Sequence, residues 1–286
     1  MGFRKLDNFL RNLKFLASHN LERHLSASLD SYKYELEDVA LPRPEILDAE
    51  SAIDRLVRTG DSFVRYGDGE LAIMMGRSVG FQRFDPRLAE RLCEILAADR
   101  DRVMVGIPRY WFYYSEALLD SAKHYFRAWV ARHRAAFLER LNLSKRYYDA
   151  CASCMYATYR DYDFHAHYGK VRDIWRDKKV TVVCGRTVFD KIRPDIFDSA
   201  SDVAYLHAPS LHAYAQYDDI LARSLQVPEN RLLVLILGPT ATVLACDLAE
   251  AGRRALDLGH IAKDYVYFRD GVARDRESAG RFYEPD

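Results

Sequence analysis

Short runs of Val, Ile and Leu alternate along the chain with stretches whose apolar residues recur every three or four positions. The runs predict buried strands and the periodic stretches predict helices. Strands are predicted at residues 61–66, 102–107, 179–184, 202–207, 231–237 and 253–258. Helices are predicted at residues 44–58, 86–98, about 210–225 and about 240–251, and an aromatic-rich region at 110–175 is expected to be mainly helical. This alternation favours a Rossmann-like α/β fold, with a mainly parallel sheet covered by helices on both faces.

The pattern divides the chain into three parts. Residues 1–43 form an N-terminal helical arm and connector, residues 44–270 form the α/β domain with a helical insertion at about 110–175, and residues 271–286 form a tail. Residues 3–17 place apolar side chains at helical spacing, and residues 1–24 carry five Lys or Arg against two acids. A basic amphipathic helix suits an anionic membrane surface. Packing on the domain, or on a second copy of the chain as a homo-oligomer, is the simpler interpretation.

Composition narrows the choice of partner. The 286 residues are 49% hydrophobic and 13% aromatic, with 42 basic and 42 acidic side chains. Such a chain can bury a core, and its zero net charge gives no support to a nucleic-acid partner. No apolar run reaches the roughly 18 residues of a membrane span, and no signal peptide is recognised. We expect a cytoplasmic protein, with the N-terminal helix as the candidate for peripheral contact at the inner face of the membrane.

Cysteine and histidine pairs are interpreted as structural. The five cysteines are an odd and scattered set, which is not a disulfide framework. Cys151 and Cys154 form a C-x-x-C, but no second pair completes a zinc site. His165 and His167 lack a carboxylate at suitable spacing.

Candidate chemistry lies in the loops after the strands, because ligands of such folds bind at the carboxyl ends of the strands. Asp68 and Glu70 follow the first strand and are flanked by Gly67 and Gly69. Two carboxylates at this spacing can converge on a hard cation such as Mg²⁺ or Mn²⁺. A polar turn containing the Asp-Gly dipeptide is the alternative.

Three further loops have residues that suit a phosphate. Gly238-Pro239-Thr240 joins the most hydrophobic strand to a helix, with Thr240 as the expected N-cap and the helix N-terminus as the phosphate site. The other two loops contain Asp257 and His260, and Gly185 and Arg186. The alternative for the Gly238-Pro239-Thr240 loop is an ordinary capped turn. The alternative for the loop with Gly185 and Arg186 is a solvated surface arginine. The chain has no G-x-G-x-x-G, no P-loop and no G-x-S-x-G motif, which weakens dehydrogenase, NTPase and hydrolase interpretations.

Together these segments resemble the GT-D-type bacterial glycosyltransferase family, over most of residues 47–268. The resemblance is carried by the segments RYGDGEL, FQRFDPRLAERLCEIL, the strand that ends Gly106-Ile107-Pro108, DIWRDKKVTVVCGR, FDSASDVAYLHAPSLHAYAQYDDIL and LGPTATVLACDLAEAGRRALDLGHIAKDY. It implies a metal-dependent enzyme that transfers a sugar from a nucleoside diphosphate sugar, typically a UDP-sugar.

The resemblance also assigns roles to residues of this chain. Asp68 and Glu70 are implied to hold Mn²⁺ or Mg²⁺, and Gly67 and Gly69 to shape the loop. Residues expected to bind the donor are Arg65, Pro108, Gly185, Arg186, Gly238, Pro239, Thr240 and Asp257. The acceptor is expected to be a glycan, lipid-linked or protein-linked, in the synthesis of a surface polysaccharide or glycoprotein.

The final block departs from the family pattern G-H-I-D-x-E-Y-E-W. This chain has Ala262 in place of the Asp and Asp264 in place of the Glu. The loss at Ala262 puts a role for an acid at that position in doubt. His260 and Asp264 are the candidates for the base that activates an acceptor hydroxyl. The aromatic run at residues 110–114 suits either stacking on sugar rings or core packing.

Two other functions remain as alternatives. A Rossmann-like methyltransferase would need a glycine-rich loop after its first strand, and the segment VVCGR is poor in glycine. The second alternative is a non-catalytic glycan-binding or scaffolding module in which the nucleotide site has been lost. The intact Asp-x-Glu motif argues against this alternative.

Overall fold

The computed structural model describes residues 29, 41–113, 115–274 and 282. The expected N-terminal helix at 3–17 and most of the tail at 271–286 lie outside the described residues. Within the described part, eight strands form a single sheet in the order β1-β4-β3-β2-β8-β7-β5-β6. Each strand runs parallel to its neighbours. The predicted α/β class with a mainly parallel sheet is therefore confirmed.

Six of the strands match the six predicted ones. They are β2 (Ser62–Arg65), β3 (Val103–Ile107), β5 (Lys179–Gly185), β6 (Asp202–Ala208), β7 (Arg231–Ile236) and β8 (Ala255–Asp257). Two short strands, β1 (Ile46–Leu47) and β4 (Tyr147–Asp149), were not predicted. β1 is only two residues long, and β4 lies within the aromatic-rich region that was expected to be mainly helical, so no alternating or apolar run indicated either strand. β4 is held between β1 and β3.

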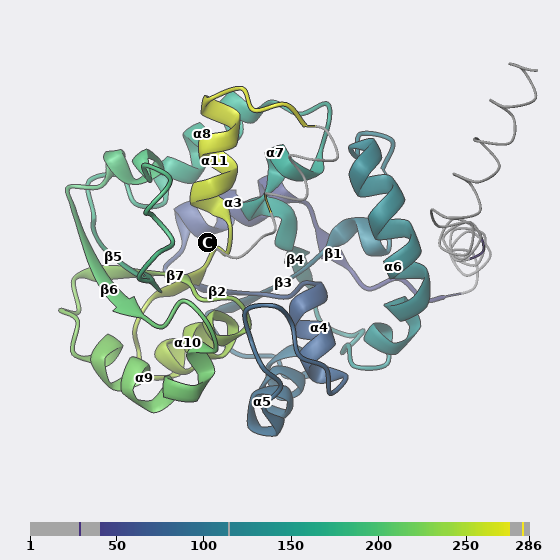
Figure 1. The fold of residues 1–286 in the computed structure, drawn as a ribbon, viewed down its shortest axis with the longest axis horizontal. Helices are drawn as coiled ribbons and strands as arrows, with labels where there is room; N and C mark the ends of the chain where they lie inside the picture. The colour runs from purple at the N-terminus through teal and green to yellow at the C-terminus, as the bar shows by residue number, and fades with distance from the viewer. Residues whose placement is uncertain (1–28, 30–40, 114, 275–281, 283–286) are drawn as a thin grey trace, which may run out of the picture.

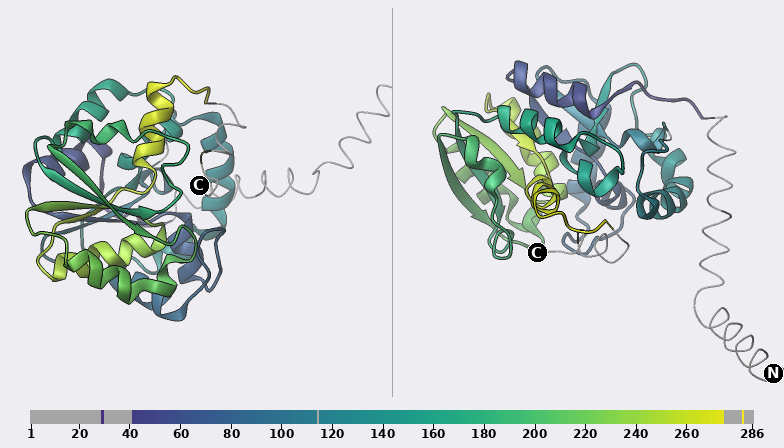
Figure 2. Two further views of the ribbon diagram at one scale, coloured as in Figure 1. Left: turned by 60° about the vertical axis from the view of Figure 1, so that its left-hand side comes forward. Right: turned by 90° about the horizontal axis from the view of Figure 1, so that it is seen from above.

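Helices cover both faces of the sheet. The α-helices are α3 (Ala49–Arg58), α4 (Asp68–Met74), α5 (Pro86–Ala97), α6 (Asp120–Leu138), α7 (Met155–Thr158), α8 (Phe164–Asp173), α9 (Tyr217–Leu225), α10 (Pro239–Glu250) and α11 (Ile261–Arg269). Short 3₁₀ turns are η1 (Arg109–Trp111), η2 (Ala150–Ser153), η3 (Asp195–Ser199) and η4 (Ala213–Gln216). Helices α5, α9 and α10 lie on one face, and α3, α8 and α11 lie on the other (Figures 1 and 2).

The region at 110–175 is less uniform than a helical insertion. It contains α6, α7 and α8, but it also contributes β4 to the sheet. Its aromatic run is core: Tyr110, Trp111 and Phe112 are exposed by 7%, 1% and 1%. Burial of these three rings favours core packing over the alternative of stacking on sugars. All five cysteines are free thiols.

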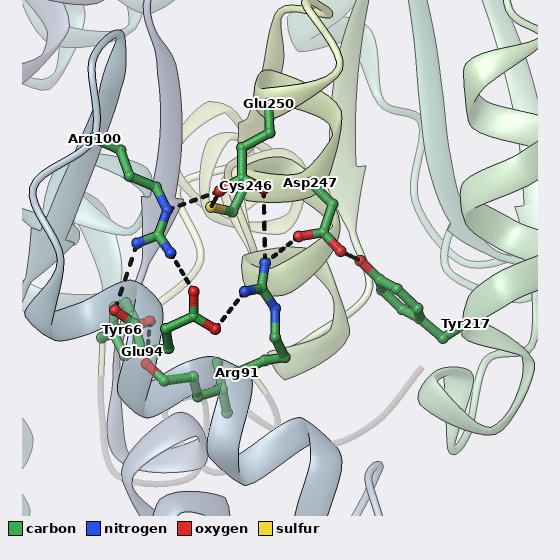
Figure 3. A network of polar contacts seen from close by, with 9 residues as sticks. Tyr66, Arg91, Glu94, Arg100, Tyr217, Cys246, Asp247 and Glu250 are labelled. Atoms are coloured by element: carbon green, nitrogen blue, oxygen red, sulfur yellow. Dashed lines mark hydrogen bonds and ion pairs between the residues drawn. The ribbon is translucent and has the colours of Figure 1, made fainter.

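A network of charged side chains fixes α5 against α10 (Figure 3). Arg91 of α5 pairs with Asp247 of α10 at 2.5 Å, and Arg100 pairs with Glu250 of α10 at 2.8 Å. Glu94 accepts hydrogen bonds from both arginines. Single pairs of this kind contribute little, but a network holds two helices in register. Helix α10 is the helix that begins at the Gly238-Pro239-Thr240 turn. In the part of the chain described, no helix combines the length and the apolar character needed to cross a membrane.

Candidate active site at the carboxyl edge of the sheet

Four of the predicted loops meet at one edge of the sheet. They follow β2, β8, β7 and β5, which are consecutive neighbours in the strand order. Because parallel strands all end at the same edge, the loops that follow them lie side by side. The connections from β5 and β7 also run in opposite directions, to β6 and to β8. A change of direction of this kind opens a crevice for a ligand in open α/β sheets.

The centre of the site is a cluster of charges at the ends of β2 and β8. Arg65 is the last residue of β2, and its guanidinium interacts with the carboxylates of Glu70 and Asp257. Asp68 interacts with the same guanidinium. Three carboxylates thus interact electrostatically with one arginine, and the group has a formal charge of −2 when all three are ionised. Such an excess of charge is costly at a partly buried site.

Burial changes the pKa values of two of these acids, Glu70 and Asp257. Burial raises the pKa of Glu70 to about 7, with Arg65 opposing the shift and Asp257 adding to it. Burial also raises the pKa of Asp257 to about 6, against the attraction of Arg65. Both carboxylates are therefore partly protonated near neutral pH unless a further positive charge joins them.

Hydrogen bonds fix this cluster on the backbone. Thr242 of α10 donates from its hydroxyl to the carbonyl of Arg65 at 2.9 Å and to Asp257 Oδ2 at 3.1 Å. One side chain thus joins α10 to β2 and to β8. Gly259 lies directly against the Arg65 guanidinium and has φ +47°, so a side chain at this position would be strained and would displace the arginine.

The Asp-x-Glu residues begin helix α4, which the sequence pattern did not predict after the first strand. Asp68 is the first residue of α4 and is exposed, whereas Glu70 is 6% exposed. Glu70 Oε2 accepts from the Gly67 amide at 2.7 Å, so the N3 side chain satisfies the amide of the N-cap residue as in one half of a capping box. The two carboxylates therefore differ: Asp68 faces solvent and Glu70 faces the charge cluster.

The residues present fit a hard divalent cation that takes part of its ligands elsewhere. In the described ranges, no three His, Cys, Asp or Glu side chains are grouped as a metal site. Mg²⁺ commonly binds one or two carboxylates and completes its coordination with water and substrate phosphates. The exposed Asp68, the buried Glu70 and the negative excess around Arg65 suit this mode of binding.

The turn before α10 differs from the expected capped turn. Gly238, not Thr240, is the N-cap residue, and its φ of +54° favours glycine. Thr240 lies inside the first turn, and its hydroxyl donates to Gln82 Oε1 at 3.3 Å. The expectation that Thr240 caps the helix was wrong, because the left-handed glycine already turns the chain. The helix N-terminus itself lies at the carboxyl edge as expected.

The remaining predicted donor-binding residues lie in the flanking loops. Arg186 is exposed and forms no hydrogen bond or ion pair with any described residue. Gly185 packs so closely on Ser210 that a Cβ would lie 2.8 Å from its Cα. Pro108 follows β3 and begins η1, where Asp149 accepts from the Arg109 amide at 3.1 Å. Contact of these residues with a donor stays a prediction.

Both candidate bases have surroundings that weigh against that role. Asp264 is fully buried and accepts from the amides of Tyr156 and Ala157 at 3.1 and 2.9 Å and from the Tyr168 hydroxyl at 2.6 Å. This geometry favours an anchor between α11 and α7. His260 precedes α11, and burial beside Arg65 and Lys263 lowers its pKa to about 3. Its imidazole is neutral at physiological pH and a weak base.

Several residues at this edge were not singled out from the sequence. Thr242 and Gln82 connect the loops, and Phe282 covers His260 with ring centroids 5.3 Å apart. Phe282 is 1% exposed although it was expected in the tail. His167, in contrast, fits the structural interpretation, since its ring nitrogen lies 3.0 Å from the Ala152 carbonyl oxygen.

The fold and the site define an α/β protein of the glycosyltransferase class. A family model described as "Glycosyltransferase GT-D fold" matches residues 63–283. This match covers more than half of the chain, so the chain belongs to the GT-D family. It extends beyond residue 270 and includes Phe282.

Relatives and solved structures agree with the family. The chain is 32% identical over 245 residues to a probable glycosyl transferase, Gly, of Streptococcus gordonii, covering 83% of this chain and 36% of the relative. It is 24% identical over 281 residues to glycosyltransferase GlyD of Streptococcus pneumoniae serotype 4, covering 95% and 33%. The chain thus spans about a third of the length of these curated relatives. A solved structure described as a new glycosyltransferase (DUF1792) from Streptococcus sanguinis has a TM-score of 0.74 and 34% identity, covering 82% of this chain and 87% of that one.

Replacement of Asp264 tests its role as an anchor. In Asp264→Asn, one oxygen becomes an amide group that faces a donor, so we expect the free energy of unfolding to fall by about 1–3 kcal/mol. Chemical denaturation measures this change. Asp218→Asn, at an exposed position of α9, is the matched control and should leave stability unchanged. An Asp264→Asn variant as stable as the wild type would contradict the anchoring role.

Removal of the Phe282 ring tests the environment of His260. Phe282→Ala opens the imidazole to water, so the pKa of His260 should rise from about 3 by at least about one unit toward the ordinary value of 6.5. NMR titration of the histidine ring protons measures it. His167 is the internal control, because burial at a different place lowers its pKa to about 4 and the substitution should not change it. An unchanged His260 pKa would show that Phe282 does not shield the ring.

Proposed function

We propose that this chain is a metal-dependent glycosyltransferase domain that transfers a sugar from a nucleoside diphosphate sugar, a UDP-sugar in the first instance, to a hydroxyl of a glycan acceptor. The acceptor class is a lipid-linked or protein-linked glycan of surface polysaccharide or glycoprotein synthesis. The single observation that carries the proposal is the cluster of Asp68, Glu70 and Asp257 around Arg65 at the carboxyl edge. Membership of the GT-D family removes the methyltransferase alternative.

In this proposal Asp68 and Glu70 hold Mn²⁺ or Mg²⁺. When bound, the ion neutralises the charge that develops on the leaving diphosphate. The two acids have different surroundings, because Asp68 is exposed and Glu70 accepts a hydrogen bond from the Gly67 amide. Gly67 and Gly69 keep the backbone of this loop free of side chains beside the ion.

The rest of the diphosphate site is built from positive groups and backbone amides. The first turn of α10 begins directly after the Gly238-Pro239 turn, and a helix N-terminus favours an anion. Arg65 contributes a guanidinium whose buried Nε has no hydrogen-bond partner among the described residues. Arg186 adds an exposed charge from the loop after β5. These donors stabilise the leaving group as its charge grows.

A neutral His260 limits the role that this residue can play as a base toward the acceptor hydroxyl. With its pKa lowered to about 3 by burial, the imidazole can orient a hydroxyl through a hydrogen bond, but it holds a transferred proton poorly. Asp264 is occupied by the backbone of α7. Catalysis therefore depends on stabilisation of the leaving diphosphate more than on a strong base of the chain.

Metal-dependent hydrolysis of a panel of UDP-sugars tests the function. We expect release of UDP with Mn²⁺ and none with chelator. Asp68→Asn and Glu70→Gln should lower turnover by about 100-fold or more, as loss of a group that stabilises developing charge usually does. Glu70→Gln is informative because the Gln side-chain oxygen can also accept the hydrogen bond from the Gly67 amide, so the charge is lost while this contact is kept.

The control for this experiment is Glu90→Gln, at an exposed position of α5, which should retain full turnover. Full activity in Asp68→Asn or Glu70→Gln would overturn the metal assignment. A wild-type chain that binds UDP and Mn²⁺ but hydrolyses no donor in the panel would instead support the non-catalytic module.

A further inference from the structure

A short loop between α4 and α5 lies over the proposed diphosphate site. The loop is closed by an antiparallel bridge in which Val79 and Gln82 exchange backbone hydrogen bonds of 2.9 and 3.1 Å. It carries two phenylalanines, Phe81 and Phe84. Phe84 is 40% exposed, whereas Phe81 is half-buried. The two rings of one loop therefore have different surroundings.

The loop is attached to the segment after β6 through His212. The His212 amide donates to the Phe81 carbonyl at 2.8 Å, and the Arg83 amide donates to His212 Nδ1 at 3.1 Å. His212 has φ +55°, which is uncommon for a residue with a side chain. Strained conformations of this kind persist where the surrounding structure fixes them, and they concentrate at functional sites.

A second attachment joins the loop to α10. Gln82 is 3% exposed, and its Oε1 accepts from the Thr240 hydroxyl and the Tyr214 amide, each at 3.3 Å. Its Nε2 donates to the Arg83 carbonyl at 2.9 Å. Both ends of this side chain are thus used within the protein. The loop is held in place on two sides, so the position of Phe81 between them is fixed.

The Phe81 ring lies against the two glycine turns of the site. A Cβ on Gly238 would come within 2.5 Å of the ring, and a Cβ on Gly69 would lie 3.9 Å from it. The ring is not among the side chains of the hydrophobic core or packed against that core. It has no aromatic partner among the described residues. The half-buried position of Phe81 thus comes from the site loops and not from the core.

We propose that Phe81 is the stacking platform for the base of the nucleoside diphosphate. The inference rests on the proposed function and names the group that recognises the nucleoside. A π-face suits every base, and the neighbouring Gln82 and His212 Nδ1 are already used to hold the loop. A sugar ring would need polar partners at this place, whereas a base needs a flat apolar face.

Titration calorimetry with two probes tests the platform on the full chain in Mn²⁺. UDP has a base and pyrophosphate has none. We expect Phe81→Ala to bind UDP about 10- to 100-fold more weakly, the range that stacking on one base supplies, and to bind pyrophosphate as the wild type does. Phe81→Tyr should restore UDP affinity. Phe81→Leu keeps an apolar side chain over Gly238 and should still lose UDP affinity selectively.

Phe84→Ala, in the same loop but at the exposed ring, is the matched control and should change neither affinity. Equal loss of UDP and pyrophosphate in Phe81→Ala would show that the ring only supports the turn, and unchanged UDP affinity would also overturn the platform. A wild-type chain that binds neither probe overturns the proposed function and this inference together. A wild-type chain that binds UDP, with Phe81→Ala equal to it, overturns the inference alone.

Discussion

The site depends on the interaction of Arg65 with the carboxylates of Glu70 and Asp257 at the seam between β2 and β8. Burial raises the pKa values of Glu70 and Asp257, and the attraction of the single Arg65 guanidinium does not offset this effect. A protein that keeps such a negative excess at a ligand edge is prepared for a cation. In the proposed function, a cation held by these acids would allow a negative diphosphate to bind beside them.

A few contacts between neighbouring elements fix the positions of the charged side chains in this cluster. Thr242 joins α10 to both strands of the seam, and Gly259 leaves room for the arginine. The network of Arg91 and Arg100 holds the C-terminal half of α10 against α5 through Asp247 and Glu250. The helix N-terminus that would receive the phosphates is therefore positioned by contacts along the whole length of α10. Rigid support of this kind suits electrostatic stabilisation of a leaving group.

The local parts of this arrangement were predictable from the sequence, and the long-range parts were not. Asp68 and Glu70 could be singled out because they are glycine-flanked acids directly after an apolar strand. His260 also follows a predicted strand, so it was expected at the same carboxyl edge of the sheet. The expected cap at Thr240 was wrong, because the left-handed Gly238 takes that position. The two amides that donate to Asp264 belong to α7, about a hundred residues earlier in the chain, as the separations of 108 and 107 positions show. Gln82 and Thr240 are 158 positions apart, and no local pattern indicates such a contact.

The central claim is that the negative cluster around Arg65 takes up a metal ion and a nucleoside diphosphate together. Titration calorimetry of UDP with and without Mn²⁺ measures this coupling directly. We expect Mn²⁺ to raise the affinity for UDP by at least about 10-fold and, by linkage, UDP to raise the affinity for Mn²⁺ by the same factor. Equal affinity for UDP in the presence and absence of the ion would contradict the claim.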